Sequence, residues 1–209
     1  MRLYNCAIYG DLAFAENSYP DFLFYNCYVE NPYVSSGGFS ETTTAFVNCV
    51  INWNSGIFYS YILGRNTMHS EHVFNLNFYN CIFNWTSSSY GGSNGSYILP
   101  NTATCYNCLS INKSTLFNNL VSGGNNKTID EAEAVFTTYR NGHNEGETFE
   151  LIPTAKATYK GTDGTEIGMQ GGKYPYTTTV QYPIITKFGS DSQTNKQGKL
   201  NIEVEVDGK

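Results

Sequence analysis

Charge is scarce in this sequence, and long hydrophobic runs are missing. Only 14% of the 209 residues are charged, the net charge is −6, and the 12 Lys and Arg are scattered. Because no basic stripe is present to neutralise a phosphate backbone, we expect no nucleic-acid partner. No run of ~18 apolar residues occurs, so we expect no membrane span in this chain.

Aromatic residues and glycine are what the chain has in quantity, with 17 Tyr, 13 Phe and 20 Gly. Tyr and Phe favour strands, and glycine favours turns. A chain of 209 residues can bury a sizeable core in one domain and still carry a small appendage. The composition therefore predicts an all-β fold.

One short motif recurs five times along the first half of the chain. The copies are LYNCAI at 3–8, FYNCYV at 24–29, FVNCVI at 46–51, FYNCIF at 78–83 and CYNCLS at 105–110. Their shared cysteines lie 21, 22, 32 and 27 residues apart. A base period of about 22 residues with insertions is typical of one solenoid turn. We predict a right-handed parallel β-helix over residues 1–128.

Within each copy the alternation of apolar residues breaks once, at the Asn, which predicts a bend. The residue that opens the copy, the Cys and the last residue then face inward. Asn tolerates the left-handed region, and its amide can bond the equivalent amide one repeat away. We therefore expect two structural ladders, which contain Asn5, Asn26, Asn48, Asn80 and Asn107, and Cys6, Cys27, Cys49, Cys81 and Cys108.

Residues 129–209 follow a different pattern. Asp130 resembles an N-cap before acidic residues, which predicts a short helix over 130–139 that covers the open end of the coil. A Gly-rich segment comes next, and the alternating residues 200–206 indicate a half-buried strand. That strand either lies against the solenoid or pairs near Ile184 and Ile185 in a small β appendage.

Three further segments carry a resemblance to known proteins: NNLVSGG at 118–124, TID at 128–130 and YKGTDGTEIGMQGGKYP at 159–175. With the Asn-Cys repeats, they resemble the C-terminal part of secreted or surface right-handed parallel β-helix proteins of gut bacteria, of pectate-lyase-like type. The resemblance spans nearly the whole chain and implies this fold, together with export or surface attachment. Proteins of this architecture include polysaccharide lyases, glycoside hydrolases and adhesins, so the activity stays open.

The six cysteines are interpreted as buried free thiols. Parallel side chains one strand spacing apart point the same way and are poorly aimed for a disulfide. Cys105 and Cys108 have the spacing of half a zinc site, but the sequence offers no second CxxC or HxxxH partner. We therefore predict neither a metal nor a cofactor.

The longest insertion, around residues 54–72, holds the densest polar cluster. An Arg and an imidazole there would meet an acidic sugar, whereas the alternative is a loop with exposed His residues and packed tyrosines. The candidate ligand-binding residues of this insertion are Tyr59, Tyr61, Arg65, His69, Glu71 and His72.

A second candidate is a column of tyrosines on one outward face. Aromatic rings can stack on sugar rings, and they can equally stabilise neighbouring repeats without a ligand. The column is predicted to contain Tyr4, Tyr25, Tyr28, Tyr79 and Tyr106, with Tyr25 and Tyr79 as its candidate ligand-binding residues.

We predict an exported or surface module that binds polysaccharide or is structural, without an active site of its own. The acids of residues 1–128 show no paired spacing of the kind that glycosidases need. A fragment of a β-helix polysaccharide lyase or glycoside hydrolase is one alternative, and an adhesin or stalk is another. Because a complete copy of the motif already stands at 3–8, we expect an N-terminally trimmed chain, with its oligomeric state left open.

Overall fold

The computed structural model describes residues 1–10, 12–14, 21–30, 32–34, 43–53, 75–85, 99, 103–112, 114–118, 120, 122–138, 147–177, 184–190 and 202–207. The chain divides into two compact units, Met1–Tyr176 and Thr177–Lys209. The described residues are mostly strand, with one 3-10 turn and one short helix. This composition of elements, with its parallel sheets, agrees with the all-β prediction.

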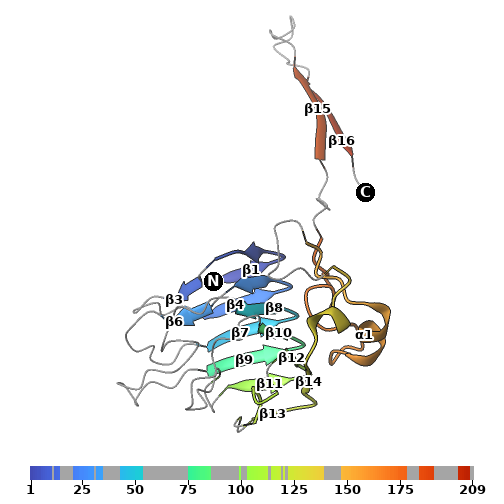
Figure 1. The fold of residues 1–209 in the computed structure, drawn as a ribbon. Coiled ribbons are helices and arrows are strands. Elements are labelled where there is room, and N and C mark those ends of the chain that lie inside the picture. Colours follow the sequence, from blue (N-terminus) through green and yellow to red (C-terminus); the bar gives the residue numbers. More distant parts are fainter. Residues whose placement is uncertain are drawn as a thin grey trace, which may run out of the picture. The chain divides into compact units, whose positions relative to one another are not determined.

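Two six-stranded sheets form most of the first unit, and all their neighbouring strands are parallel. Sheet A contains, in spatial order, β1 (Arg2–Tyr4), β4 (Phe22–Tyr25), β7 (Thr43–Val47), β9 (Asn75–Tyr79), β11 (Thr104–Tyr106) and β13 (Ser122–Gly124). Sheet B contains, in spatial order, β2 (Ala7–Ile8), β5 (Tyr28–Glu30), β8 (Val50–Trp53), β10 (Ile82–Trp85), β12 (Leu109–Ile111) and β14 (Lys127–Ile129). Each repeat adds one strand to each sheet, so the strands stack in chain order (Figure 1).

The first two repeats also contribute a third strand each. β3 (Leu12–Phe14) pairs in parallel with β6 (Pro32–Val34), in a two-stranded sheet of its own. Each of these two repeats therefore consists of three short strands in succession, each strand in a different sheet.

The five Asn residues of the motif form the bends between sheet A and sheet B. Their φ angles lie between 51 and 56°, the left-handed region that Asn tolerates better than most residues. Backbone bonding continues through each bend: the Asn26 N–H donates to the Val47 carbonyl at 3.0 Å, and the Val50 N–H donates to the Cys27 carbonyl at 2.9 Å. The predicted bend is therefore present in all five copies.

A sixth repeat follows the five that the motif identifies. β13 and β14 continue the register of β11 and β12, and Asn125 bends the chain between them with φ 57°. Asn126 occupies the position of the cysteine, where its Oδ1 accepts from the Cys108 N–H at 2.9 Å and its Nδ2 donates to the Cys105 carbonyl at 2.9 Å. Sequence analysis missed this repeat because Gly, Asn, Lys and Thr replace the apolar residues of the motif.

The space between the sheets is filled by stacked aromatic rings, aliphatic side chains and thiols. The rings of Phe24, Phe46 and Phe78 stack with centroid distances of 4.7 and 5.1 Å. The motif cysteines from the second to the fifth repeat are buried beside them, as are Val29 and Ile51. The inward orientation predicted for the opening residue, the Cys and the final residue holds in these repeats.

The outer face of sheet B is covered by the C-terminal segment, residues 130–138 and 147–176. Sheet B and the segment share one hydrophobic cluster. The sheet contributes Tyr28, Val50, Ile82, Leu109 and Ile111, and the segment contributes Ala132, Val135, Phe136, Phe149, Leu151, Ala155, Ile167 and Met169. The repeats end at β14, close to the predicted boundary at residue 128, but the compact unit extends to Tyr176.

The helix predicted over residues 130–139 is reduced to one 3-10 turn, Ala132–Ala134 (η1), which has no side-chain cap. The helix does not continue beyond this turn, because Phe136 then forms a bridge with Leu151. A short helix that the sequence did not indicate, α1 (Pro153–Thr158), begins at a proline, which fits the first turn of a helix.

The second unit contains an antiparallel pair, β15 (Ile184–Ser190) and β16 (Ile202–Asp207). Of the two arrangements left open for the strand near residues 200–206, the structure has the pairing with the segment around Ile184 and Ile185. Lys187 Nζ and Glu203 Oε1 form a cross-strand ion pair at 2.8 Å.

Candidate functional site on the outer face of sheet A

The outward side chains of sheet A form two parallel columns. The strand register aligns Tyr4, Tyr25, Val47, Tyr79, Tyr106 and Gly124 in one column. A second column, two residues earlier on each strand, contains Arg2, Leu23, Ala45, Asn77, Thr104 and Ser122. Neither hydrophobic cluster of the described residues includes Leu23, Ala45 or Val47. This face therefore differs from the outer face of sheet B, which the C-terminal segment covers.

The tyrosines stack in two pairs, Tyr4 with Tyr25 and Tyr79 with Tyr106. Their centroids lie 5.2 and 6.0 Å apart, with interplanar angles of 5 and 8°. Tyr4 and Tyr106 are 49% and 38% exposed, and Tyr25 and Tyr79 are half-buried. Within each pair, each ring covers one face of the other. A ligand that lies along the column would therefore contact the rims and hydroxyls of the pair.

Val47 interrupts the tyrosine column between Tyr25 and Tyr79. Each of these two tyrosines stacks on another tyrosine on one side and has the short side chain of Val47 on the other. The neighbouring residue of the second column on the same strand is Ala45, also short, and both are half-buried. The register therefore leaves a gap in the column over Val47, the recess, with a tyrosine on the neighbouring strand at either side.

Tyr28 does not belong to this column, contrary to prediction. It lies on the outer face of sheet B, and it is fully buried. Its ring stacks on Phe149 of the C-terminal segment at 4.7 Å. Burial raises the pKa of its hydroxyl well above the usual range, and the neighbouring Glu30 charge adds to this effect. Parity gave the correct outward direction, but parity carries no information on which outer face is covered.

The asparagine bends face the Gly-rich part of the C-terminal segment. The Asn26 amide donates to the carbonyls of Met169 and Gly171 at 2.9 and 2.7 Å, and Asn80 Oδ1 accepts from the Thr162 N–H at 3.1 Å. These amides thus bond the segment rather than one another, because its backbone brings donors and acceptors to the bends. Between repeats, the amide of Asn125, which the predicted ladder does not include, donates to Asn107 Oδ1 at 2.5 Å.

The glycines of the Gly-rich segment permit this contact. A Cβ on Gly161 would lie 2.9 Å from the Asn80 amide, and one on Gly172 would overlap the Asn48 amide. Gly172 also has φ 75°, a conformation that side chains disfavour. Gly161 and Gly172 therefore have a packing role against the asparagine bends.

The cysteines form the predicted inward column and are free thiols. The Cys49 thiol donates to the carbonyls of Phe24 and Val47 at 3.4 and 3.3 Å. The Cys81 thiol donates to the carbonyls of Phe46 and Tyr79, both at 3.3 Å. Burial raises the pKa of the Cys81 thiol well above its usual range, and bonding to the Cys108 and Cys49 thiols adds to this. A buried thiol in the state of Cys81 fills the core and is a poor nucleophile.

The predicted polar cluster of the longest insertion lies outside the described residues. This concerns all of its members, namely Tyr59, Tyr61, Arg65, His69, Glu71 and His72. Their role in ligand binding stays a prediction, and the site considered below contains only Tyr25 and Tyr79 from the predicted ligand-binding set.

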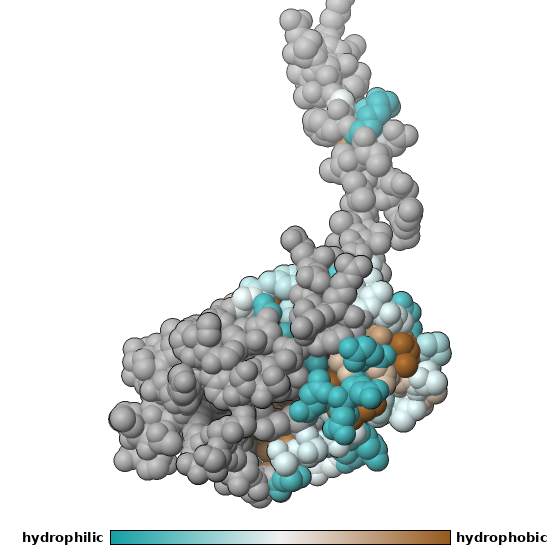
Figure 2. Space-filling view, in the orientation of Figure 1, coloured by the Kyte–Doolittle hydropathy of each residue, from teal (hydrophilic) through white to brown (hydrophobic). Residues whose placement is uncertain are grey.

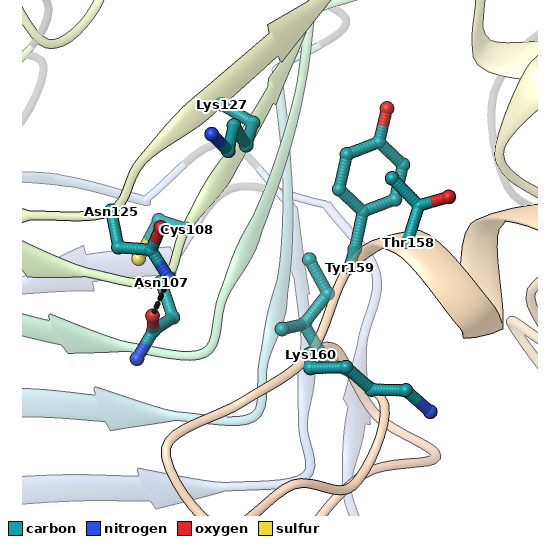
Figure 3. A pocket seen from close by; sticks show the side chains of 8 residues that line it. Asn107, Cys108, Asn125, Lys127, Thr158, Tyr159 and Lys160 are labelled. Carbon is teal, nitrogen blue, oxygen red and sulfur yellow. Dashed lines mark hydrogen bonds between the residues drawn. The ribbon is translucent and has the colours of Figure 1, made fainter.

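A small pocket lies where the last two bends face the segment that follows α1. It is lined by Asn107, Cys108, Asn125, Lys127, Thr158, Tyr159, Lys160 and Ile167, and it holds about 100 Å³. Figure 3 shows Asn107, Asn125 and Lys127 on one side and Thr158, Tyr159 and Lys160 on the other, with the bond between the two amides. Whole small-molecule ligands usually occupy about 300 to 1,000 Å³, so this pocket is too small for a sugar chain.

Hydrophilic residues cover much of the described surface in the view of Figure 2, with smaller hydrophobic areas between them. Within the described ranges, no helix has the length and apolar character needed to cross a membrane. Among the same residues, no three His, Cys, Asp or Glu side chains come together in a way that would hold a metal ion.

Comparison with known proteins adds no assignment. No protein-family model, curated protein or solved structure matches this chain.

Proposed function

We propose that this chain is a polysaccharide-binding module whose binding surface is the outer face of sheet A. The observation that carries the proposal is the column of outward tyrosines beside a column of small and polar side chains, on a sheet face that the hydrophobic clusters formed by the described residues leave out. Aromatic groups with amides and hydroxyls nearby are the side chains that sugar binding needs. The module acts by binding and has no catalytic role of its own.

The same proposal takes the first unit to be a right-handed parallel β-helix. In support, the strands of each repeat alternate between two parallel sheets in chain order, and β3 and β6 supply a third side in the first two repeats. Connections between parallel strands of one sheet are right-handed in about 98% of cases. An experimental structure would test the handedness directly, and a left-handed coil would contradict it.

We also propose that this protein is exported or attached to the cell surface, as its resemblance to pectate-lyase-like β-helix proteins implies. A polysaccharide ligand is consistent with that location. Labelling of intact cells with an antibody against this chain tests the location, and labelling only after the cells are permeabilised would contradict it.

The test of the function is a screen of the full chain against an array of plant, mucin and bacterial polysaccharides, with released sugar ends assayed in the same wells. We expect saturable binding without release of sugar ends. Tyr25→Ala and Tyr79→Ala should weaken it, whereas Tyr174→Ala should not, since Tyr174 is 61% exposed and lies outside sheet A.

Two outcomes of the screen contradict the proposal in different ways. Release of sugar ends would support the alternative of a polysaccharide lyase or hydrolase. Unchanged binding by both column variants, with melting temperatures that show them folded, would place the binding surface away from the column.

A further inference from the structure

The interruption of the tyrosine column at Val47 has the dimensions of a single ring. Tyr25 and Tyr79 pair with Val47 from the two neighbouring strands, so the bases of the two side chains are two strand spacings apart, about 9.4 to 9.8 Å. For side chains that extend in parallel, a ring placed midway would have its centre about 4.7 to 4.9 Å from the centre of each tyrosine ring. That separation falls within the range of about 4.5 to 7 Å for stacked rings.

One ring face of Tyr25 and one ring face of Tyr79 border this recess, and these faces are not covered within the stacked pairs. Tyr4 covers one face of Tyr25, and Tyr106 covers one face of Tyr79. The other faces point toward the position of Val47. The floor consists of Val47 and Ala45, which are apolar and half-buried, and Asn77 lies beside Ala45 on the adjacent strand. The recess is thus apolar on three sides, with an amide at its rim.

This arrangement selects the shape and polarity of the ring. A ring held between two aromatic faces must itself be apolar on both faces and carry its polar groups around the rim. A pyranose with all its hydroxyls equatorial satisfies this condition, because its two faces carry axial C–H groups. A galacto-configured ring does not, since its axial hydroxyl at C4 would be placed against one tyrosine and lose its hydrogen bonds to water.

We propose that the recess over Val47 is a subsite for one all-equatorial, gluco- or xylo-configured pyranose, which inserts between Tyr25 and Tyr79. The inference rests on the proposed function and specifies both the position and the sugar class for it. The Asn77 amide bonds the hydroxyl rim of the inserted ring, and the rest of the polysaccharide extends from the face of sheet A.

The experiment fills the recess with the side chain that completes the column. Val47→Tyr should stack on Tyr25 and Tyr79, so its melting temperature should equal or exceed that of the native chain. Its affinity for a soluble β-glucan oligosaccharide should nevertheless fall at least tenfold. Val47→Ala, the matched control, keeps the recess open and should bind within about threefold of the native chain. The readout is titration calorimetry on the full chain, with a β-galactan oligosaccharide of equal length in parallel.

The outcomes separate the subsite from the function on which it rests. If the native chain binds the glucan and Val47→Tyr binds equally well or better, the ligand runs along the outer rims of the column and the subsite is overturned, while the proposed function stands. If galactan binds as tightly as glucan, the sugar class is overturned. If the native chain binds no polysaccharide in the array, both the subsite and the proposed function fail.

Discussion

The ring of Tyr28 in sheet B stacks on the ring of Phe149 in the C-terminal segment, with centroids 4.7 Å apart and an interplanar angle of 17°. Phe149 is 2% exposed and holds its position with φ 53°, a conformation that costs a side-chain-bearing residue about 1 to 2 kcal/mol. Packing against sheet B outweighs that cost. The contact joins two parts of the chain that lie far apart in sequence.

Phe149→Ala should therefore destabilise the first unit strongly. Removal of a buried Phe side chain typically costs about 3 to 5 kcal/mol, and the loss should appear in the free energy of unfolding measured with urea. Tyr174→Ala, at an exposed ring, should change stability by less than about 0.5 kcal/mol. A loss below about 1 kcal/mol for Phe149→Ala would mean that the segment does not depend on this contact.

Asn26 combines a backbone role and a side-chain role, which two substitutions separate. Asn26→Gly keeps the bend but removes the donors to Met169 and Gly171, at a cost of about 1 to 3 kcal/mol. Asn26→Ala should cost about 1 to 2 kcal/mol more, because alanine disfavours the left-handed region. Asn5→Gly is the control, since Asn5 has φ 52° and is exposed, and it should be nearly neutral. Equal losses for the Ala and Gly variants of Asn26 would contradict the backbone role.

The thiols should be unreactive while the protein is folded. Five of the six are buried and Cys6 is half-buried, and the raised pKa of Cys81 disfavours its thiolate. In a neutral buffer, a thiol reagent should label Cys6 at most, and it should label all six after denaturation without a reductant. Fewer than six after denaturation would reveal a disulfide, and rapid labelling of two or more in the folded chain would contradict the packing of the core.

Glu166 should make stability depend on pH. Burial raises the pKa of its carboxyl, a shift that Lys156 opposes at 3.9 Å. A carboxyl with a raised folded-state pKa contributes stability below its unfolded pKa, and this contribution is lost as the pH rises through the folded pKa. Glu166→Gln should therefore raise the melting temperature at pH 7 relative to the native chain, with a smaller difference at pH 4.

Glu150→Gln is the matched control for Glu166→Gln. Glu150 is exposed and bonds the same Lys156 at 2.7 Å, so the substitution should remove no more than the small contribution of a surface ion pair. If Glu166→Gln lowers the melting temperature by the same amount at both pH values, desolvation of its carboxylate is not the dominant effect.

The repeats and their bends could be predicted from sequence because each depends on local chemistry. The Asn at each bend adopts a left-handed φ. The inward-facing positions of the motif pack in the core in the same way in each repeat. The sixth repeat was missed because the bend at Asn125 is preserved while the apolar signal is lost. The buried pair Asn52 and Asn84, which bond at 2.8 Å, was also missed, although each precedes a Trp just after a copy of the motif.

What sequence analysis could not supply is the long-range arrangement. Tyr25 and Tyr28 both face outward by parity, but they lie on opposite sides of the bend at Asn26, in sheet A and sheet B. Only the structure shows that Phe149 and the C-terminal segment cover the side of Tyr28. The amides of Asn26 and Asn80 were expected to bond along the coil, but the Gly-rich segment, more than 80 residues beyond Asn80, brings competing backbone groups. The interruption at Val47 is already visible in the aligned copies of the motif, but the stacking that leaves one face of Tyr25 and one of Tyr79 toward it follows only from the structure.

The most direct test of the central claim is the affinity of Tyr79→Ala and Tyr79→Phe for the polysaccharide that the native chain binds best, measured beside their melting temperatures. A binding role for the column predicts a loss of at least about tenfold, or 1.4 kcal/mol, for the Ala variant and little loss for Phe, which keeps the ring. If Tyr79→Ala melts at a lower temperature yet binds like the native chain, the tyrosines only stabilise the repeats, and the outer face of sheet A is not the binding surface.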